Sequence, residues 1–216
     1  MVGEVRGLRK FDLMKYLIVK RLFDVFFSFL VLVIIFPFLI TISLIIKYDT
    51  NGPVLFLSIR SGKNNKDFKI YKFRTMYYLS NTDKMTTSAT DERITPVGRF
   101  LRKYKLDELP QFINVLKGEM SIVGPRPELP YYTRKYSKNE RVILSVQPGI
   151  TDFASIKYHK LSAMMPDKDT NNFFEEKILK NKNLLRIKYV NELSFLTDLN
   201  IFFKTIFKIL LIFVKK

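Results

Sequence analysis

The chain of 216 residues contains no cysteine, no tryptophan and a single histidine, His159. The absence of cysteine excludes disulfide bonds and thiolate metal sites. A single histidine excludes a metal site built from several histidines and argues against a histidine-based catalytic triad. We expect His159 to be an ordinary surface or core residue. Any nucleophile must then be a serine, a threonine, a lysine or a carboxylate.

Acidic residues are scarce beside basic ones: 20 Asp and Glu stand against 37 Lys and Arg, which gives a formal net charge of +17 at pH 7. Such a charge favours an anionic partner, which could be a nucleic acid, a phosphate compound or an acidic membrane surface. The length fits one domain with a substantial core. Charge alone does not choose among these partners, but the distribution of apolar residues favours a membrane.

Residues 25–46 contain no charge and are flanked by the basic residues Lys20, Arg21 and Lys47. This stretch is long enough to cross the hydrocarbon core of a bilayer. Pro37, near its middle, predicts a break or a kink. Two arrangements remain open, a kinked helix that crosses the membrane and a re-entrant helix that turns at Pro37 and leaves on the side where it entered. Basic residues at both ends suit the second arrangement.

A β-hairpin is predicted from two strands, residues 54–60 and 68–74, which are separated by a polar loop. Lys72 and Arg74 lie two residues apart on the second strand, so we expect their side chains to share one face. Two cations on one face can bind a diphosphate. A solvated basic strand face is the alternative.

The most informative stretch is residues 105–127, K-L-D-E-L-P-Q-F-I-N-V-L-K-G-E-M-S-I-V-G-P-R-P. Pro110 suits the first turn of a helix and Gly118 its end, so a short helix is predicted over 110–117 with Asp107 and Glu108 just before it. The positive end of the helix dipole keeps a carboxylate ionised, as a nucleophile or a metal ligand requires. Arg126, between two prolines, offers a cation whose planar fork matches phosphate. A pair of solvated helix-capping acids is the alternative.

Further helices are predicted over residues 97–104, 131–146, 173–189 and 193–214. The first has a basic side, which suits either an anionic membrane surface or an amphipathic core helix, and the last suits the membrane interface. The sequence therefore predicts a mostly helical α+β fold. Residues 1–47 would form an arm and a re-entrant membrane helix, 48–192 a small cytoplasmic catalytic domain with the hairpin, and 193–216 an interfacial amphipathic helix.

The string D-E-L-P-Q followed by G-E-M-S-I-V-G-P-R-P resembles the bacterial sugar transferase family, the monotopic phosphoglycosyl transferases that start polysaccharide and glycoprotein glycan assembly. K-R-L-F-D at 20–24, K-F-R-T-M at 72–76 and P-G-I-T at 148–151 extend the resemblance. Four positions depart from the family pattern, namely Phe36, Ser58, Gln147 and Asp152.

The resemblance implies a membrane helix broken at Pro37, a UDP-sugar donor, undecaprenyl phosphate as acceptor, magnesium as cofactor, and no nucleic acid partner. By similarity, Asp107 is the nucleophile, which forms an aspartyl phosphosugar and releases UMP, and Glu108 helps to hold the magnesium. Lys72, Arg74 and Arg126 would offset the charge of the phosphates. The protein would work at the cytoplasmic face of the bacterial inner membrane.

Two other interpretations stay open. The four departures from the family pattern would fit an inactive or altered family member. The basic charge and the membrane segment would also fit a membrane-anchored binding module. The intact D-E-L-P-Q and G-P-R-P strings favour the enzyme over both.

Overall fold

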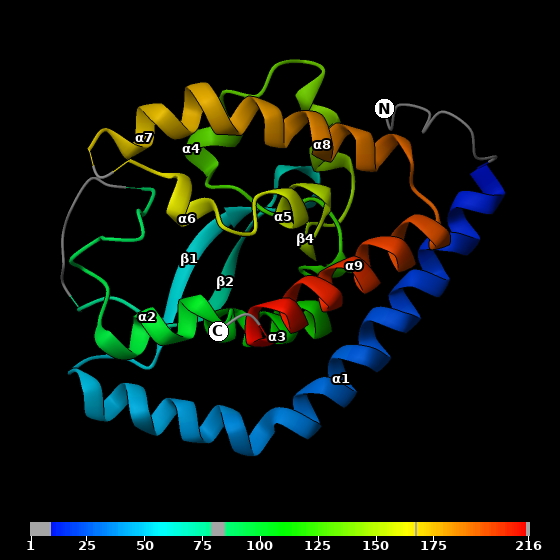
Figure 1. Ribbon diagram of the computed structural model, residues 1–216. Helices are drawn as coiled ribbons and strands as arrows, with labels where there is room; N and C mark the ends of the chain where they lie inside the picture. The colour runs from blue at the N-terminus through cyan, green and yellow to red at the C-terminus, as the bar shows by residue number, and fades with distance from the viewer. Residues whose placement is uncertain (1–9, 79–84, 167, 215–216) are drawn as a thin grey trace.

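The computed structural model describes residues 10–78, 85–166 and 168–214 (Figure 1). The protein is mostly helical, as the sequence predicts, and has two small sheets, of which the sequence predicts one. Figure 1 shows α8 along one side of the molecule and α1 along the opposite side, with the hairpin and α3 between them.

Helix α1 (Lys10–Asp49) is 40 residues long and contains Pro37. Figure 1 shows that it is bent around the globular part. Pro37 removes one backbone hydrogen bond, and Thr41 Oγ1 donates to the Pro37 carbonyl at 3.1 Å, a contact that favours bending. Within the described residues α1 is the one helix long and apolar enough to cross a membrane, and only 11% of its most apolar stretch is buried.

Strands β1 (Leu55–Ser61) and β2 (Asp67–Phe73) form the predicted antiparallel hairpin, with Ser58 opposite Ile70. Strand β2 ends at Phe73, and the Arg74 N–H extends the pairing by donating to the Val54 carbonyl at 2.8 Å. The side chains of Lys72 and Arg74 nevertheless do not meet, because Lys72 contacts Glu108 whereas the Arg74 guanidinium contacts backbone carbonyls. The polar loop contains a short 3-10 turn, Lys63–Asn65, that closes the hairpin.

The next two helices agree with the sequence. Helix α2 (Pro96–Lys103) begins at a proline, and the side chain of Thr95 accepts a hydrogen bond from the Gly98 N–H. Helix α3 (Gln111–Lys117) follows Pro110 and ends at Gly118, whose φ of 80° lies in the left-handed region that glycine tolerates.

The helix expected over 131–146 is absent from the described structure. Helix α4 (Pro130–Thr133) is a single turn, and a separate 3-10 turn covers Glu140–Ser145. The backbone N–H of Ser137 donates to Glu140 Oε2 at 2.8 Å, and its hydroxyl donates to the same oxygen at 2.8 Å. These bonds begin a new turn at Ser137 in the manner of a capping box, so the first helix does not continue.

A short parallel pair, which the sequence did not predict, joins β3 (Ser121–Val123) to β4 (Gly149–Thr151). It is followed by α5 (Phe153–Lys157) and α6 (Leu161–Met164). Gly149 is required here, because a Cβ on it would lie 2.1 Å from the Gly124 nitrogen.

The C-terminal part is helical, as predicted. Helix α7 (Thr170–Phe173), a π-helical segment (Phe174–Leu179) and α8 (Lys180–Asn191) follow one another, and α9 (Phe195–Val214) comes last. The main core contains Val115, Met120, Ile122, Val190 and Ile201.

Both halves of α1 pack on the globular part. Before Pro37, Phe27 lies 6.4 Å from Phe112 of α3 and 5.2 Å from Phe202 of α9, measured between ring centroids. After Pro37, Ile42 and Ile46 are buried in a cluster with Phe73 and Leu101. The helix therefore touches the same domain at both ends of its apolar stretch.

Candidate active site

Asp107 and Glu108 lie in a 3-10 turn, Leu106–Glu108, directly before α3, as the sequence predicts. Lys105 has a φ of 60° and reverses the chain direction between α2 and this turn. The turn carries the pair inward, and Asp107 is only 8% exposed. The acids are therefore partly or fully buried rather than solvated capping residues.

One oxygen of Glu108 receives two cations from distant parts of the chain. Lys72 of β2 donates from Nζ to Oε1 at 2.9 Å, and Arg126 of the segment after β3 donates from Nη2 to the same oxygen. Burial alone would raise the pKa of Glu108, but the charges of Arg126 and Lys72 outweigh it and hold that pKa well below its usual range. Glu108 is therefore ionised, and its second oxygen remains for a further ligand.

Asp107 is in a different situation. Its Oδ1 is buried and has no hydrogen-bond partner among the described residues. Burial raises the pKa of Asp107 and the charge of Glu108 raises it further, against the smaller opposing effects of Lys72 and Arg102. A buried polar atom without a partner is costly, and such atoms mark positions where a ligand binds.

These residues fit a magnesium ion. Mg²⁺ is commonly held by one or two carboxylates together with waters and substrate phosphates. Asp107 Oδ1 has no partner, and Glu108 keeps one oxygen outside its two ion pairs. Among residues 10–78, 85–166 and 168–214 no group of three or more His, Cys, Asp and Glu could hold a metal, so phosphates and waters would have to complete the coordination.

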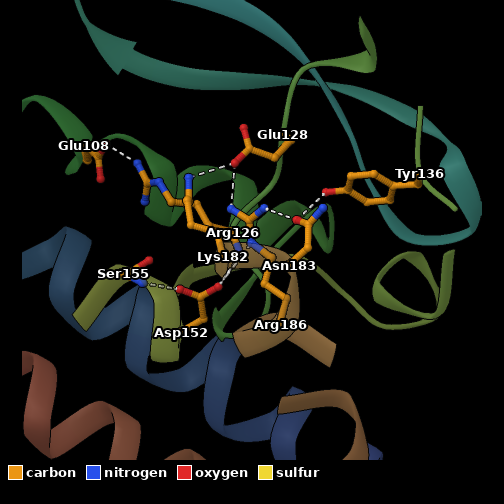
Figure 2. A network of polar contacts seen from close by, with 9 residues as sticks. All are labelled: Glu108, Arg126, Glu128, Tyr136, Asp152, Ser155, Lys182, Asn183 and Arg186. Carbon is orange, nitrogen blue, oxygen red and sulfur yellow. Dashed lines mark hydrogen bonds and ion pairs between the residues drawn. The ribbon is translucent and has the colours of Figure 1, made fainter. Parts of the chain in front are cut away.

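Arg126, which Figure 2 shows beside Glu108, is held by two further contacts. Its Nη1 donates to the Ile150 carbonyl at 3.0 Å, and its backbone N–H donates to Asp152 Oδ2 at 3.1 Å. Asp152 Oδ1 also accepts from the Ser155 N–H at 2.6 Å at the start of α5. Asp152, one of the departures from the family pattern, therefore fixes the position of the segment that carries Arg126.

A second layer of buried charges lies behind Arg126. Glu128 Oε1 accepts from Lys182 at 2.9 Å and from Arg186 at 2.7 Å, and Arg186 Nε lies 3.6 Å from Asp152 (Figure 2). Sequence reasoning missed these residues. The only local signal was the spacing of Lys182 and Arg186, which places them on one face of a helix.

Arg74 does not join this group. Its guanidinium donates to the carbonyls of Pro53, Asn51 and Thr50 at 2.7 to 2.8 Å, and to that of Ile46 at 3.4 Å. Arg74 thus holds the end of α1 and the turn after it. Of the predicted site residues, the structure brings together Asp107, Glu108, Lys72 and Arg126.

The other departures lie outside this group. Phe36 is exposed on α1, and Ser58 is in β1. Gln147 donates from Nε2 to the carbonyl of Gly118, the residue that ends α3. None of the three contacts either acidic residue through a hydrogen bond in the described part of the chain.

Comparisons with known proteins show to which family the chain belongs. The family described as bacterial sugar transferase matches residues 15–211. A UDP-glucose:undecaprenyl-phosphate glucose-1-phosphate transferase of Klebsiella pneumoniae is 40% identical over 196 residues, which cover 89% of this chain and 40% of the relative. A UDP-N-acetylgalactosamine-undecaprenyl-phosphate N-acetylgalactosaminephosphotransferase of Aeromonas hydrophila is 35% identical over 202 residues, 90% of this chain and 44% of the relative.

The chain spans less than half the length of these two relatives. It spans most of a third, an uncharacterized sugar transferase of Bacillus subtilis (strain 168). That relative is 36% identical over 195 residues, which cover 90% of this chain and 88% of the relative. The similarity therefore includes both the helix α1 and the acidic pair, and the chain belongs to the bacterial sugar transferase family.

Proposed function

We propose that this protein transfers a sugar phosphate from a UDP-sugar to undecaprenyl phosphate and releases UMP, as the first membrane step of glycan assembly. The observation that carries the proposal is the acidic pair. Glu108 is held by Lys72 and Arg126, while the neighbouring Asp107 has a buried oxygen without a partner. The names of the relatives, which include undecaprenyl-phosphate sugar phosphotransferases, support the same reaction class.

In the first step Asp107 acts as the nucleophile. A carboxylate oxygen forms a bond to the phosphorus next to the sugar, and the bond from that phosphorus to the bridging oxygen breaks. The electron pair of the broken bond leaves on UMP. The product on the protein is an aspartyl phosphosugar.

In the second step an oxygen of undecaprenyl phosphate attacks the same phosphorus. The bond to Asp107 breaks, and its electron pair returns to the carboxylate. The product is undecaprenyl diphosphate sugar, and the protein is regenerated. The two steps predict ping-pong kinetics.

The surrounding residues supply positive charge where the phosphates react. Lys72 and Arg126 reach the site from two elements and are fixed by Glu108, so they need little reorganisation during the reaction. Magnesium held by Glu108 beside Asp107 would neutralise phosphate charge and favour the ionised form of Asp107. Arg74 has no place in this mechanism, because its donors are taken up by carbonyls at the end of α1.

The acceptor is a lipid, and we infer that α1 and α9 contact the membrane that contains it. Their outward faces expose large apolar side chains, among them Phe26, Phe29, Ile34, Phe203, Phe207 and Leu210. Exposed apolar area of this extent is rare on proteins that do not contact a membrane or a partner. The excess of basic residues would favour the anionic cytoplasmic leaflet of the bacterial inner membrane.

We further propose that α1 enters and leaves the membrane on the cytoplasmic side. Phe27 packs on α3 and α9, and Ile42 and Ile46 pack near α2 and β2. A helix that crossed the bilayer between these positions would have to contact the domain from both sides of the membrane. The bend of α1, which contains Pro37, favours the re-entrant arrangement over a crossing one.

Trapping tests the proposed chemistry. Purified protein is incubated with labelled UDP-sugars and magnesium in the absence of acceptor, and label on the protein and UMP in solution are measured. We expect both products from the wild type and neither from Asp107→Asn, with equal thermal midpoints for the two proteins.

Label on Asp107→Asn would refute the assignment of the nucleophile. If no donor in a broad panel gave UMP or label with the wild type, the altered family member or the binding module would be favoured. The sugar that labels the wild type would at the same time be identified as a donor.

A further inference from the structure

A cavity adjoins the ion pairs of Glu108, since Lys72 and Arg126 are among its lining residues. It has a volume of about 60 Å³. Four of the side chains that line it are basic, and the lining consists of Arg60, Ile70, Lys72, Arg126, Pro127, Glu128 and Lys182. Since a single water needs only roughly 10–15 Å³ of such space, the cavity can hold a group larger than one water.

Arg60, in β1, differs from the other cations around this cavity. Lys72 and Arg126 share Glu108, and Lys182 is paired with Glu128. Arg60 forms no ion pair in the described part of the chain, and its Nε is buried without a hydrogen-bond partner. A buried guanidinium donor without an acceptor is costly, so an anion in the cavity would remove a penalty that the empty site carries.

Lys182 is the second residue that can turn to a ligand. Glu128 accepts hydrogen bonds from both Lys182 and Arg186, and Arg186 is fully buried. If Lys182 moved its ammonium towards an anion in the cavity, Glu128 would still be paired with Arg186. The network therefore allows Lys182 to bind a ligand without leaving a carboxylate unpaired.

We propose that Arg60 and Lys182 bind the phosphate of the donor that leaves with the nucleoside. This inference rests on the proposed function. Lys72 and Arg126 line the cavity and also contact Glu108, so the cavity begins directly beside the acidic pair. The two phosphates of a nucleoside diphosphate sugar are separated by one bridging oxygen. When the sugar phosphate lies at Asp107, the phosphate that leaves with the nucleoside is placed to enter the cavity.

UMP, the product that carries this phosphate, is the probe. Its dissociation constant is measured by calorimetry on full-length protein in detergent with magnesium, for the wild type, Arg60→Met, Arg60→Lys and Lys182→Met. We expect the constant to rise about 10- to 150-fold in Arg60→Met and in Lys182→Met, the range for losing one hydrogen bond to a charged group. Arg60→Lys keeps the charge and should give a smaller rise.

Two variants and one ligand serve as controls. Arg134→Met and Lys180→Met remove the same charges from exposed positions, the second on the same helix as Lys182, and should leave UMP affinity unchanged. Uridine lacks the phosphate, so its affinity should be equal in the wild type and in Arg60→Met. The kcat/KM for undecaprenyl phosphate, which in ping-pong kinetics depends on the second step alone, should also be unchanged in Arg60→Met.

UMP affinities within twofold of the wild type in folded Arg60→Met and Lys182→Met would overturn the proposal. Arg60→Lys provides the same test if Arg60→Met does not fold, because lysine cannot replace the Nε donor. Release of UMP by the wild type is scored separately. If the wild type releases UMP but the variants bind it normally, this phosphate site is refuted and the proposed reaction stands.

Discussion

Arg126→Lys separates the geometry of the site from its charge. In the structure the guanidinium uses two nitrogens at once, with Nη2 on Glu108 and Nη1 on the Ile150 carbonyl at 3.0 Å. A lysine ammonium keeps the positive charge but is a single point on a flexible chain. It can satisfy Glu108 or the Ile150 carbonyl, but it cannot hold both in the arrangement that arginine gives.

The size of the effect follows from these contacts. One lost hydrogen bond to a charged group costs about 1.5–3 kcal/mol. If that contact is needed in the transition state, kcat/KM falls roughly 10- to 150-fold, since about 1.36 kcal/mol corresponds to a factor of ten. The fold should be little affected, because the backbone N–H of Arg126 still donates to Asp152 and Lys72 still pairs with Glu108.

The assay is the initial rate of UMP release as a function of donor concentration at a saturating level of acceptor. Arg134→Lys makes the same exchange at an exposed position and should behave as the wild type. Binding to vesicles that contain anionic lipid should be equal for all three proteins. A kcat/KM of Arg126→Lys within threefold of the wild type would refute the idea that the fixed fork of Arg126 contributes to catalysis.

Three further outcomes follow from contacts described above. Arg74→Met should lower Tm by roughly 4–12 °C, because buried carbonyls lose their donor, while the donor KM stays within twofold of the wild type; a large rise in KM would place Arg74 in the site after all. Because the chain has no cysteine, Lys15→Cys and Tyr48→Cys can each be labelled alone, and a membrane-impermeant maleimide on the cytoplasmic side should modify both; modification of only one would contradict the same-side arrangement of α1. Burial alone would raise the pKa of Glu128, but its two basic partners outweigh burial and hold that pKa below the ordinary 4.5, so its contribution to stability is present above about pH 4.5 and is lost as the pH falls. Glu128→Gln should therefore lower Tm at pH 7 more than at pH 4, and equal losses at both would count against this ion-pair network.

The acidic pair and α3 could be predicted because their signals are local. Pro110 and Gly118 define the ends of the short helix, and the backbone takes up the left-handed conformation at Gly118. The hairpin was also predictable, since two strand-like runs flank a polar turn. In these segments the sequence and the tertiary structure favour the same local conformation.

Other features depend on contacts between distant residues. Arg74 was expected beside Lys72, but β2 ends one residue earlier and the carbonyls at the end of α1 take its donors. Glu128 lies in the loop that follows β3, whereas its partners Lys182 and Arg186 lie more than 50 residues later on α8. No spacing in the sequence predicts contacts between residues so far apart along the chain. The incorrect prediction of one helix over 131–146 has a different cause. Here the S-x-x-E pattern from Ser137 to Glu140 is a local signal that predicts the interruption.

The polar side chains in the first half of α1 limit how this protein can be shortened. Arg21 donates to the carbonyls of Val115 and Leu116 at the end of α3, at 2.6 and 2.9 Å. Lys20 donates to the Val123 carbonyl at 2.8 Å. A fragment that begins after Asp49 would lose all three contacts. The carbonyls that would lose their donors belong to the segments on either side of the acidic pair and Arg126.

Deleting α1 would therefore not yield a water-soluble catalytic fragment. Asp24 adds to the difficulty, since its carboxylate accepts from the Ile122 N–H at 3.0 Å inside the protein. A detergent-free version would have to keep the inner face of the helix and exchange only outward side chains such as Phe26, Phe29 and Ile34 for polar ones. Helix α1 is in this respect an integral part of the globular domain, and exchange of its outward apolar side chains is the route to a soluble enzyme.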